Sequence, residues 1–400
     1  MSENELDAVT PSLYHRIRGF VRRPEIAWSL TLFLLTRLFL SLLGYELWSM
    51  GMVPEGPDPS VYFGYAVSPV GGGAAGVLLG VWRRWDAIHY LRIAAEGYSS
   101  VELFTFLPLY PLLVRLVGTV LGGHMLLGSM IVSSVACLLL LIVLHKLVTD
   151  EGLGLDVARR SLIYLVIFPT AFFLFVPYTE SLFMLLCVVT LREARRERWL
   201  PASLAAFAAV LTRLVGVTLL FVLVIEMLRS VNWDPRRLGA RLALASFPVI
   251  GFGGFLAWRA WAGVPGMSEA LAALWNRVPA FPWQGIVLTL QRISTGDVWL
   301  AECFDFAVVL LMFGLGIIVV KRLPLSYGAF FWSGLLFNLS QVRLDQPLGG
   351  QGRYSLPLFP AFIVLARLGR SPRWNRIIFV VSVSLWVFWA SVFIMWRWVG

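Results

Sequence analysis

The segment with the clearest chemical content is WRRWDAIHYLRIAAEGY, at residues 82–98. At helical spacing Asp86 and His89 share one face, while Trp85 and Tyr90 supply aromatic rings of the kind that gather at a membrane surface. A carboxylate that aromatic rings partly shield from water suits a general base that takes a proton from a sugar hydroxyl. The alternative is structural, with Asp86 capping the helix or pairing with one of the two arginines before it.

A second candidate lies in FPTAFFLFVPYTESLF, at residues 168–183, where Glu180 interrupts an apolar block. Ionisable side chains at membrane depth are costly, and they usually face a cavity or a partner. Glu180 is therefore a candidate functional residue. The alternative is that Thr179 and Glu180 begin a helix after Pro177, where the helix dipole favours a negative charge.

Two arginines are candidates for binding a phosphate. Arg213 lies in LTRLVG, and Arg353 lies with Tyr354 at the start of a helix that follows the glycine-rich loop QVRLDQPLGGQG. A guanidinium can bind a phosphate through two parallel hydrogen bonds, and glycines would let the backbone approach a ligand. The alternatives are that Arg213 extends to the lipid headgroups and that the loop carries a solvated pair of Arg343 and Asp345.

The composition places these residues in a membrane protein. Of the 400 residues 58% are hydrophobic and 14% are charged, whereas soluble domains have about 25% charged residues. The mean hydropathy is +0.78. The net charge of +10 therefore indicates arginine-rich cytoplasmic loops and contact with membrane lipids, and no nucleic acid is expected as a partner.

Runs of about 20 apolar residues predict membrane helices. The basic residues before the first run place the N-terminus in the cytoplasm, so residues 51–105 form the first external loop, with interfacial helical structure near residues 83–97. Further external loops are expected at residues 263–301 and 341–352. The single spans are predicted at residues 27–48, 242–261, 304–320, 327–340, 354–368 and 377–396.

Two blocks have the length of a broken hairpin rather than of one span. Residues 164–191 are interrupted by two prolines, and residues 200–228 are interrupted at Thr212 and Arg213. A break at membrane depth must be buried in protein or line a wet cavity, because lipid cannot hydrogen-bond to the freed backbone. Both breaks are therefore expected at a common cavity on the external side.

Residues 106–147 leave the topology open. They could form two crossings, or one interfacial helix at residues 106–120 and one crossing at residues 125–147. Two crossings would place residues 146–160, which include several basic side chains, outside the cell, against the positive-inside rule. The chain is thus predicted to be an all-α polytopic protein with about ten or eleven membrane helices, a cytoplasmic basic segment at residues 1–25 and a single membrane domain at residues 26–400.

The motifs of several enzyme classes are absent from the sequence. It contains no P-loop, HExxH, DxD or GxSxG motif and no paired acidic clusters of a two-metal site, so no cofactor is required and a divalent metal is possible but not indicated. A secondary transporter is the main alternative function, because transporters also use discontinuous helices and buried charges. A non-catalytic lipid-handling membrane protein is a further alternative.

At five segments the sequence resembles a known family. WDAIHYLRIAAEGY, FLPLYPLLVRL, FPTAFFLFVPYTESLF, LTRLVG and GRYSLPLFP occur in the order found in the polytopic mannosyltransferases that add the second mannose in GPI-anchor assembly, and in their prokaryotic relatives. The second block departs slightly, since relatives often begin it with two phenylalanines. The short loops of this chain are also unlike the eukaryotic members, and they suggest a bacterial protein.

The resemblance implies a GT-C class glycosyltransferase fold and an essential acidic residue in the first external loop. The acidic residue falls on Asp86. The resemblance also implies a polyprenyl-phosphate sugar donor, with mannose as the expected sugar, and a lipid-linked or glycan acceptor. The active site would lie on the extracytoplasmic face of a bacterial plasma membrane, or in the endoplasmic reticulum membrane of a eukaryote.

On this hypothesis Asp86 is the general base of an inverting transfer. Arg213 and Arg353 are expected to hold the departing lipid phosphate, which arginines could stabilise without a metal. The remaining motif residues are expected to bind substrate: Trp85, His89, Tyr90, Tyr178, Glu180 and Tyr354.

Overall fold

The computed structural model describes residues 23–54 and 73–399, so most of the predicted basic segment and part of the first external loop lie outside the described residues. The α-helices are α2 (Pro24–Ser49), α3 (Gly73–Leu78), α4 (Asp86–Glu96), α5 (Leu109–Val120), α6 (Met125–Asp150), α7 (Leu155–Val166), α8 (Glu180–Arg195), α9 (Trp199–Val210), α10 (Leu219–Ser230), α11 (Arg241–Ala245), α12 (Phe247–Trp261), α13 (Met267–Trp275), α14 (Gln284–Thr295), α15 (Leu300–Arg322), α16 (Leu325–Leu339), α17 (Gln351–Tyr354), α18 (Pro360–Leu368) and α19 (Pro372–Ile394). Short 3-10 helices are η2 (Gly80–Trp82), η3 (Val101–Thr105), η4 (Ala171–Leu174), η5 (Leu214–Thr218) and η6 (Pro235–Arg237).

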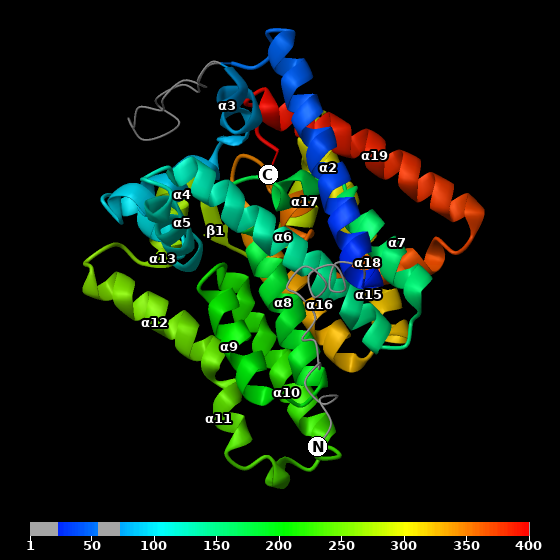
Figure 1. Cartoon of the computed structure of the whole chain (residues 1–400). Helices are drawn as coiled ribbons and strands as arrows, with labels where there is room; N and C mark the ends of the chain where they lie inside the picture. The colour runs from blue at the N-terminus through cyan, green and yellow to red at the C-terminus, as the bar shows by residue number, and fades with distance from the viewer. Residues whose placement is uncertain (1–22, 55–72, 400) are drawn as a thin grey trace, which may run out of the picture.

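The architecture is helical and polytopic, as predicted. Among the described residues, four helices are long and apolar enough to cross a membrane, namely α2, α6, α15 and α19. Figure 1 shows α2 and α19 on one flank of the molecule and α12 on the opposite flank. Most of the other predicted spans form shorter helices, such as α16 with 15 residues and α18 with 9, so the expected ten or eleven crossings are not all continuous helices.

The two predicted breaks are confirmed. The first separates α7 from α8, and the second separates α9 from α10 through η5. Residues 164–184 are all buried, so the protein interior surrounds the first break. This burial meets the requirement that backbone freed from helical hydrogen bonding be kept away from lipid.

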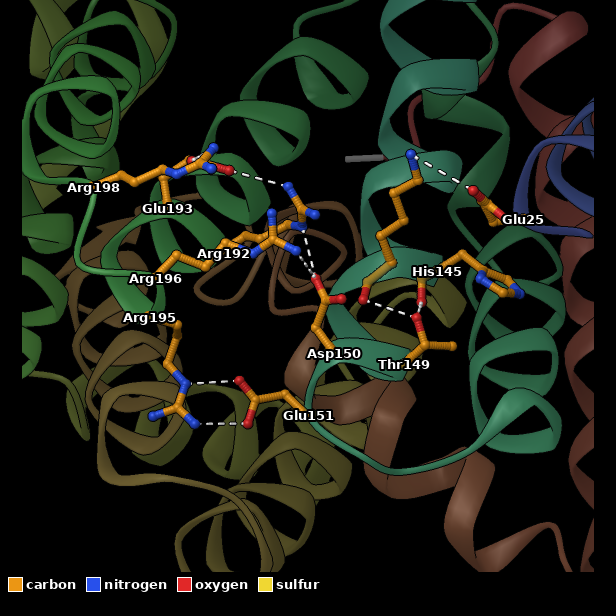
Figure 2. Close-up of polar contacts among 11 residues, drawn as sticks. Glu25, His145, Thr149, Asp150, Glu151, Arg192, Glu193, Arg195, Arg196 and Arg198 are labelled. Atoms are coloured by element: carbon orange, nitrogen blue, oxygen red, sulfur yellow. Dashed lines mark hydrogen bonds and ion pairs between the residues drawn. The ribbon is translucent and has the colours of Figure 1, made fainter. Parts of the chain in front are cut away.

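Ion pairs resolve the topology that the sequence leaves open. At the end of α6, Lys146 pairs with Glu25 at the start of α2, at 3.7 Å, and Glu151 pairs with Arg195 at the end of α8, at 2.7 Å (Figure 2). The end of α6 therefore lies on the same face of the molecule as the start of α2 and the end of α8. Only one crossing, α6, fits this arrangement. The 12-residue helix α5, whose exposed side includes Leu112 and Leu116, is then the interfacial helix.

A pair of short strands adds an element that the all-α prediction did not contain. Strand β1 (Arg277–Pro279) pairs antiparallel with β2 (Gln341–Arg343), and Arg277 stands directly opposite Arg343. The strands come from residues 263–301 and 341–352, the two later loops that the sequence predicts to be external. The first of these loops also contains α13 and α14, so it is largely structured.

Candidate functional site

Asp86 begins α4, in the first of the loops that the sequence predicts to be external. Trp85, immediately before it, has a φ of 51°, a conformation that is rare for a bulky residue and needs support from the surrounding packing. The C-terminal segment supplies that support, because the rings of Trp396 and Trp398 contact the Trp85 indole edge-on with centroids 5.8 and 5.1 Å away. This turn places Asp86, with 16% of its side chain exposed, in a cavity wall.

Arg353, on α17, contacts Asp86 and Glu180 together. Its Nη1 donates to Asp86 Oδ2 at 2.7 Å, and its Nε donates to Glu180 Oε1 at 2.5 Å. The guanidinium also lies over the rings of Phe173 and Tyr178, at 4.9 and 4.6 Å from their centroids. Because only 3% of this side chain is exposed, the two carboxylates compensate a cation that would otherwise be costly to bury.

A buried carboxylate that the sequence analysis missed fixes α17. Asp305, on α15, accepts hydrogen bonds from the backbone N–H of Gly352 at 2.6 Å and of Gly350 at 3.1 Å. The Thr170 hydroxyl donates to the Gly352 carbonyl at 2.9 Å. A Cβ on Gly352 would lie 2.5 Å from Phe304 Cε1. Gly352, which was expected to let the backbone approach a ligand, therefore allows the close approach of α15 instead.

Glu180 joins this arrangement to Arg213. Arg213 Nη1 donates to Glu180 Oε1 at 2.5 Å and to Thr179 Oγ1 at 3.3 Å. Glu180 is fully buried at the start of α8, whereas Arg213 has 16% of its side chain exposed. We call the chain of ion pairs from Asp86 through Arg353 and Glu180 to Arg213 the ion-pair network. Through it, the two broken hairpins meet at one carboxylate.

Two cavities adjoin Asp86. The smaller, of ≈ 190 Å³, borders the ion-pair network, and we call it the Arg213 cavity; polar residues in its wall also include Thr212, Asn338 and Gln341. The larger, of ≈ 410 Å³, we call the tryptophan cavity, and its wall includes Trp85, Trp275, Asn276, Arg343, Gln346 and Trp398. Asp86, Arg277 and Tyr354 line both cavities, so Asp86 stands where the two meet.

A narrow apolar groove adjoins the Arg213 cavity. Its wall includes Phe183, Phe330, Pro357 and Leu358. It shares Arg213 and Tyr354 with the cavity. Arg213 therefore stands between a polar cavity beside Asp86 and a small apolar gap of ≈ 10 Å³ among the helices.

Three predicted substrate-binding residues lie behind the cavity walls. Glu180 and Tyr178 are fully buried, and the Tyr178 hydroxyl donates to the Arg84 carbonyl at 3.0 Å. His89 is 2% exposed and stacks on Phe106 with centroids 4.9 Å apart. Burial lowers the pKa of His89 to about 4, against the opposing effect of Asp86, so the imidazole is neutral at pH 7.

The other predicted residues line the cavities, together with several that the sequence analysis did not select. Trp85, Asp86, Tyr90, Arg213, Arg353 and Tyr354 each line at least one cavity. The unselected residues with chemical potential are Trp275, Arg277, Asn338, Arg343 and Trp398. Arg277 and Arg343 lie in loops that the sequence predicts to be external. The signal that could have found them was an arginine outside the predicted cytoplasmic clusters. Within the described residues, no group of three or more His, Cys, Asp or Glu side chains could hold a metal ion.

Residues 32–231 match the model of a family described as Mannosyltransferase (PIG-V). The chain belongs to this family. The match contains Asp86, Glu180 and Arg213, so three members of the ion-pair network lie within the part of the chain that defines the Mannosyltransferase (PIG-V) family. Arg353 and the strand pair lie beyond it.

Relatives and solved structures give more limited similarity. The human GPI alpha-1,6-mannosyltransferase 2 is 37% identical over 142 residues, and the mouse enzyme is 36% identical over 143. Each alignment covers 33% of this chain and 29% of the relative. The Archaeoglobus fulgidus oligosaccharyltransferase tethered to an acceptor peptide gives a TM-score of 0.45 at 11% identity, over 96% of this chain and 56% of that one. The same enzyme with an inhibitory peptide and a dolichol-phosphate gives 0.40 at 10% identity, over 92% and 56%.

Proposed function

We propose that this protein is a membrane glycosyltransferase that transfers mannose from a polyprenyl-phosphate donor to a hydroxyl of a lipid-linked or glycan acceptor. The observation that carries the proposal is the position of Asp86 at the junction of two cavities, with one carboxylate oxygen held by Arg353. Among the described residues none donates a hydrogen bond to the other oxygen, Oδ1. That oxygen is available to take a proton.

Asp86 acts as the general base in this mechanism. The acceptor oxygen attacks the anomeric carbon of the donor as its proton passes to Asp86 Oδ1, and the bond from that carbon to the phosphate oxygen breaks. The electron pair leaves with the lipid phosphate. Attack on the face opposite to the leaving phosphate inverts the anomeric configuration.

Arg213 is the residue best placed to hold the departing phosphate. It lines the Arg213 cavity beside Asp86, and 16% of its side chain is exposed, so its guanidinium can reach a phosphate bound there. Its positive charge stabilises the anion that forms as the glycosidic bond breaks. No metal is needed for this charge compensation.

Arg353 and Glu180 position the reacting groups. The Arg353 guanidinium already donates to two carboxylates, so we assign it to the orientation of Asp86 rather than to the direct phosphate contact that the sequence suggested. Glu180 holds Arg353 and Arg213 at a fixed separation through one oxygen. Tyr178 and His89 support these residues from behind the walls.

The site belongs on the extracytoplasmic face. Glu180 begins α8 and Arg195 ends it, and 16 helical residues separate the two ends by about 24 Å. The arginine-rich end carries the ion pairs of Figure 2 and is cytoplasmic by the positive-inside rule. The end with the ion-pair network then faces outward, in the plasma membrane if the protein is bacterial.

Asp86→Asn removes the proposed general base and keeps the size of the side chain. Membranes containing the wild-type protein should transfer labelled mannose from synthetic polyprenyl-phosphate mannose. The variant should lose at least about a hundredfold in kcat, because general-base catalysis contributes about 10²–10⁴. Glu96→Gln is the matched control, since it removes a half-exposed carboxylate from the same helix and should retain activity.

A folded Asp86→Asn variant with wild-type activity would show that Asp86 is not the base. Absence of transfer from every lipid-phosphate sugar tested, by the wild type as well, would overturn the glycosyltransferase proposal and favour a transporter.

A further inference from the structure

The tryptophan cavity has a composition that the proposed donor site does not explain. Trp85, Trp275 and Trp398 line it together with Asn276 and Gln346. Aromatic faces pack against the C–H faces of sugars, and amides hydrogen-bond to their hydroxyls, so this lining is typical of a carbohydrate site. Its volume of ≈ 410 Å³ leaves room for a sugar unit.

The strand pair places two like charges in the wall of this cavity. Arg277 and Arg343 are direct partners in the antiparallel register, so their side chains leave the same face of the sheet, and both line the cavity. Like charges directly opposite one another destabilise a strand pair. The arrangement is therefore costly unless an anion compensates it.

The anions within the protein compensate this pair only in part. Arg343 Nη2 donates to Asp345 Oδ2 at 2.7 Å, but 45% of the Asp345 side chain is exposed. Arg277 lies over the Tyr354 ring at 4.9 Å, and no carboxylate of the described residues lies within 4.0 Å of its guanidinium. Arg277 therefore forms no ion pair among the described residues and can bind an anionic ligand.

We propose that the tryptophan cavity is the acceptor site and that Arg277 and Arg343 bind a phosphate group carried by the acceptor glycan. The inference rests on the proposed function, because Asp86 must then separate donor from acceptor. Arg213 lines only the Arg213 cavity and the apolar groove, whereas Arg343 lines only the tryptophan cavity. The leaving phosphate at Arg213 and the acceptor phosphate at Arg343 would then occupy different cavities, both of which Asp86 and Arg277 line.

Binding to two sugar phosphates tests this assignment without turnover. Mannose 1-phosphate carries its phosphate on the anomeric carbon, as the donor does, and mannose 6-phosphate carries it elsewhere, as a phosphorylated acceptor would. Calorimetric titration of the purified full-length protein should show mannose 6-phosphate binding at least about tenfold more tightly than mannose. Arg343→Gln should remove this preference and leave the affinity for mannose 1-phosphate unchanged.

Asp345→Asn separates anion binding from a structural salt bridge. It removes the partner of Arg343 but keeps the guanidinium, so affinity for mannose 6-phosphate should be retained or increased. A loss as large as that in Arg343→Gln would mean that the pair only holds the loop, and would overturn the proposal.

Two other results would also overturn it. One is equal affinity of the wild type for mannose and mannose 6-phosphate. The other is a loss of mannose 1-phosphate binding in Arg343→Gln, which would assign the arginines to the donor phosphate. Because no result here depends on catalysis, inactivity in the transfer assay would overturn the proposed reaction and leave this binding result standing.

Discussion

The guanidinium of Arg353 donates to Asp86 through Nη1 and to Glu180 through Nε, so two carboxylates far apart in the sequence share one cation. Glu180 in turn accepts from Arg213. Each of these residues compensates a neighbour that is buried or nearly so. Removing a single charge therefore affects the whole network. Arg213 is the more exposed of its two arginines, so a substitution there should disturb the other three residues least.

Arg213→Ala should weaken donor binding. Loss of a charge-assisted hydrogen bond to a phosphate costs about 1.5–3 kcal/mol, which corresponds to about a ten- to hundredfold rise in the donor KM. Glu180 keeps its contact with Arg353 in this variant, so the fold should be retained. Steady-state kinetics with varied polyprenyl-phosphate mannose measures the effect, and Arg213→Lys should recover part of the affinity. An unchanged donor KM would contradict the phosphate role.

At the scale of elements, the site depends on short segments held by longer helices. The four-residue helix α17 carries Arg353, and Asp305 on the long helix α15 fixes its glycines. The strand pair β1–β2 likewise joins two loops that are far apart in the sequence. The positions of the site residues therefore depend on the hydrogen bonds that hold these short segments to the longer helices and to each other.

Gly352→Ala should displace α17 from α15. The added Cβ would meet Phe304 Cε1 at 2.5 Å and Asp305 Oδ1 at 3.2 Å, and an overpacked site costs about 1–3 kcal/mol. We expect kcat to fall at least about tenfold and the thermal midpoint to drop. Gly314→Ala, on α15 itself, is the control, because a Cβ there has no atom within 4 Å. Equal activity of the two variants would show that the position of α17 is not critical.

At the scale of the whole molecule, the ion pairs in Figure 2 fix which helix ends share a face. The end of α6 lies with the start of α2 and the end of α8, so α5 lies at the opposite end of α6, with the first loop predicted to be external. This arrangement keeps the basic ends of the helices together, as the positive-inside rule requires. It also keeps α5 near α4 and the candidate site.

Cysteine labelling tests this topology. In a Cys303→Ser background, where the remaining Cys137 and Cys187 are buried, a cysteine at exposed position 124 should react with an impermeant maleimide in intact cells. A cysteine at exposed position 156 should react only after permeabilisation. If the H124C protein required permeabilisation and the D156C protein did not, α5 would be a crossing.

The sequence by itself determined that this is a multi-pass membrane protein with two broken hairpins, because hydropathy and helix breaks are local properties. It also selected Asp86, Glu180, Arg213 and Arg353, because an ionisable residue in apolar surroundings stands out in a single sequence. It did not select Asp305, although that carboxylate also lies in an apolar block, because its partners are backbone N–H groups 45 and 47 residues away.

Only the tertiary structure decided which charges meet. Asp86 and Arg353 are 267 residues apart, and Glu180 and Arg353 are 173 apart, so their pairing depends on how the helices pack. The same holds for Arg277 and Arg343, whose register is set by a strand pair between two loops. A local sequence pattern shows that a charged side chain is costly to bury. The partner that compensates this cost is set by how the chain folds, and here that partner determines the proposed chemistry.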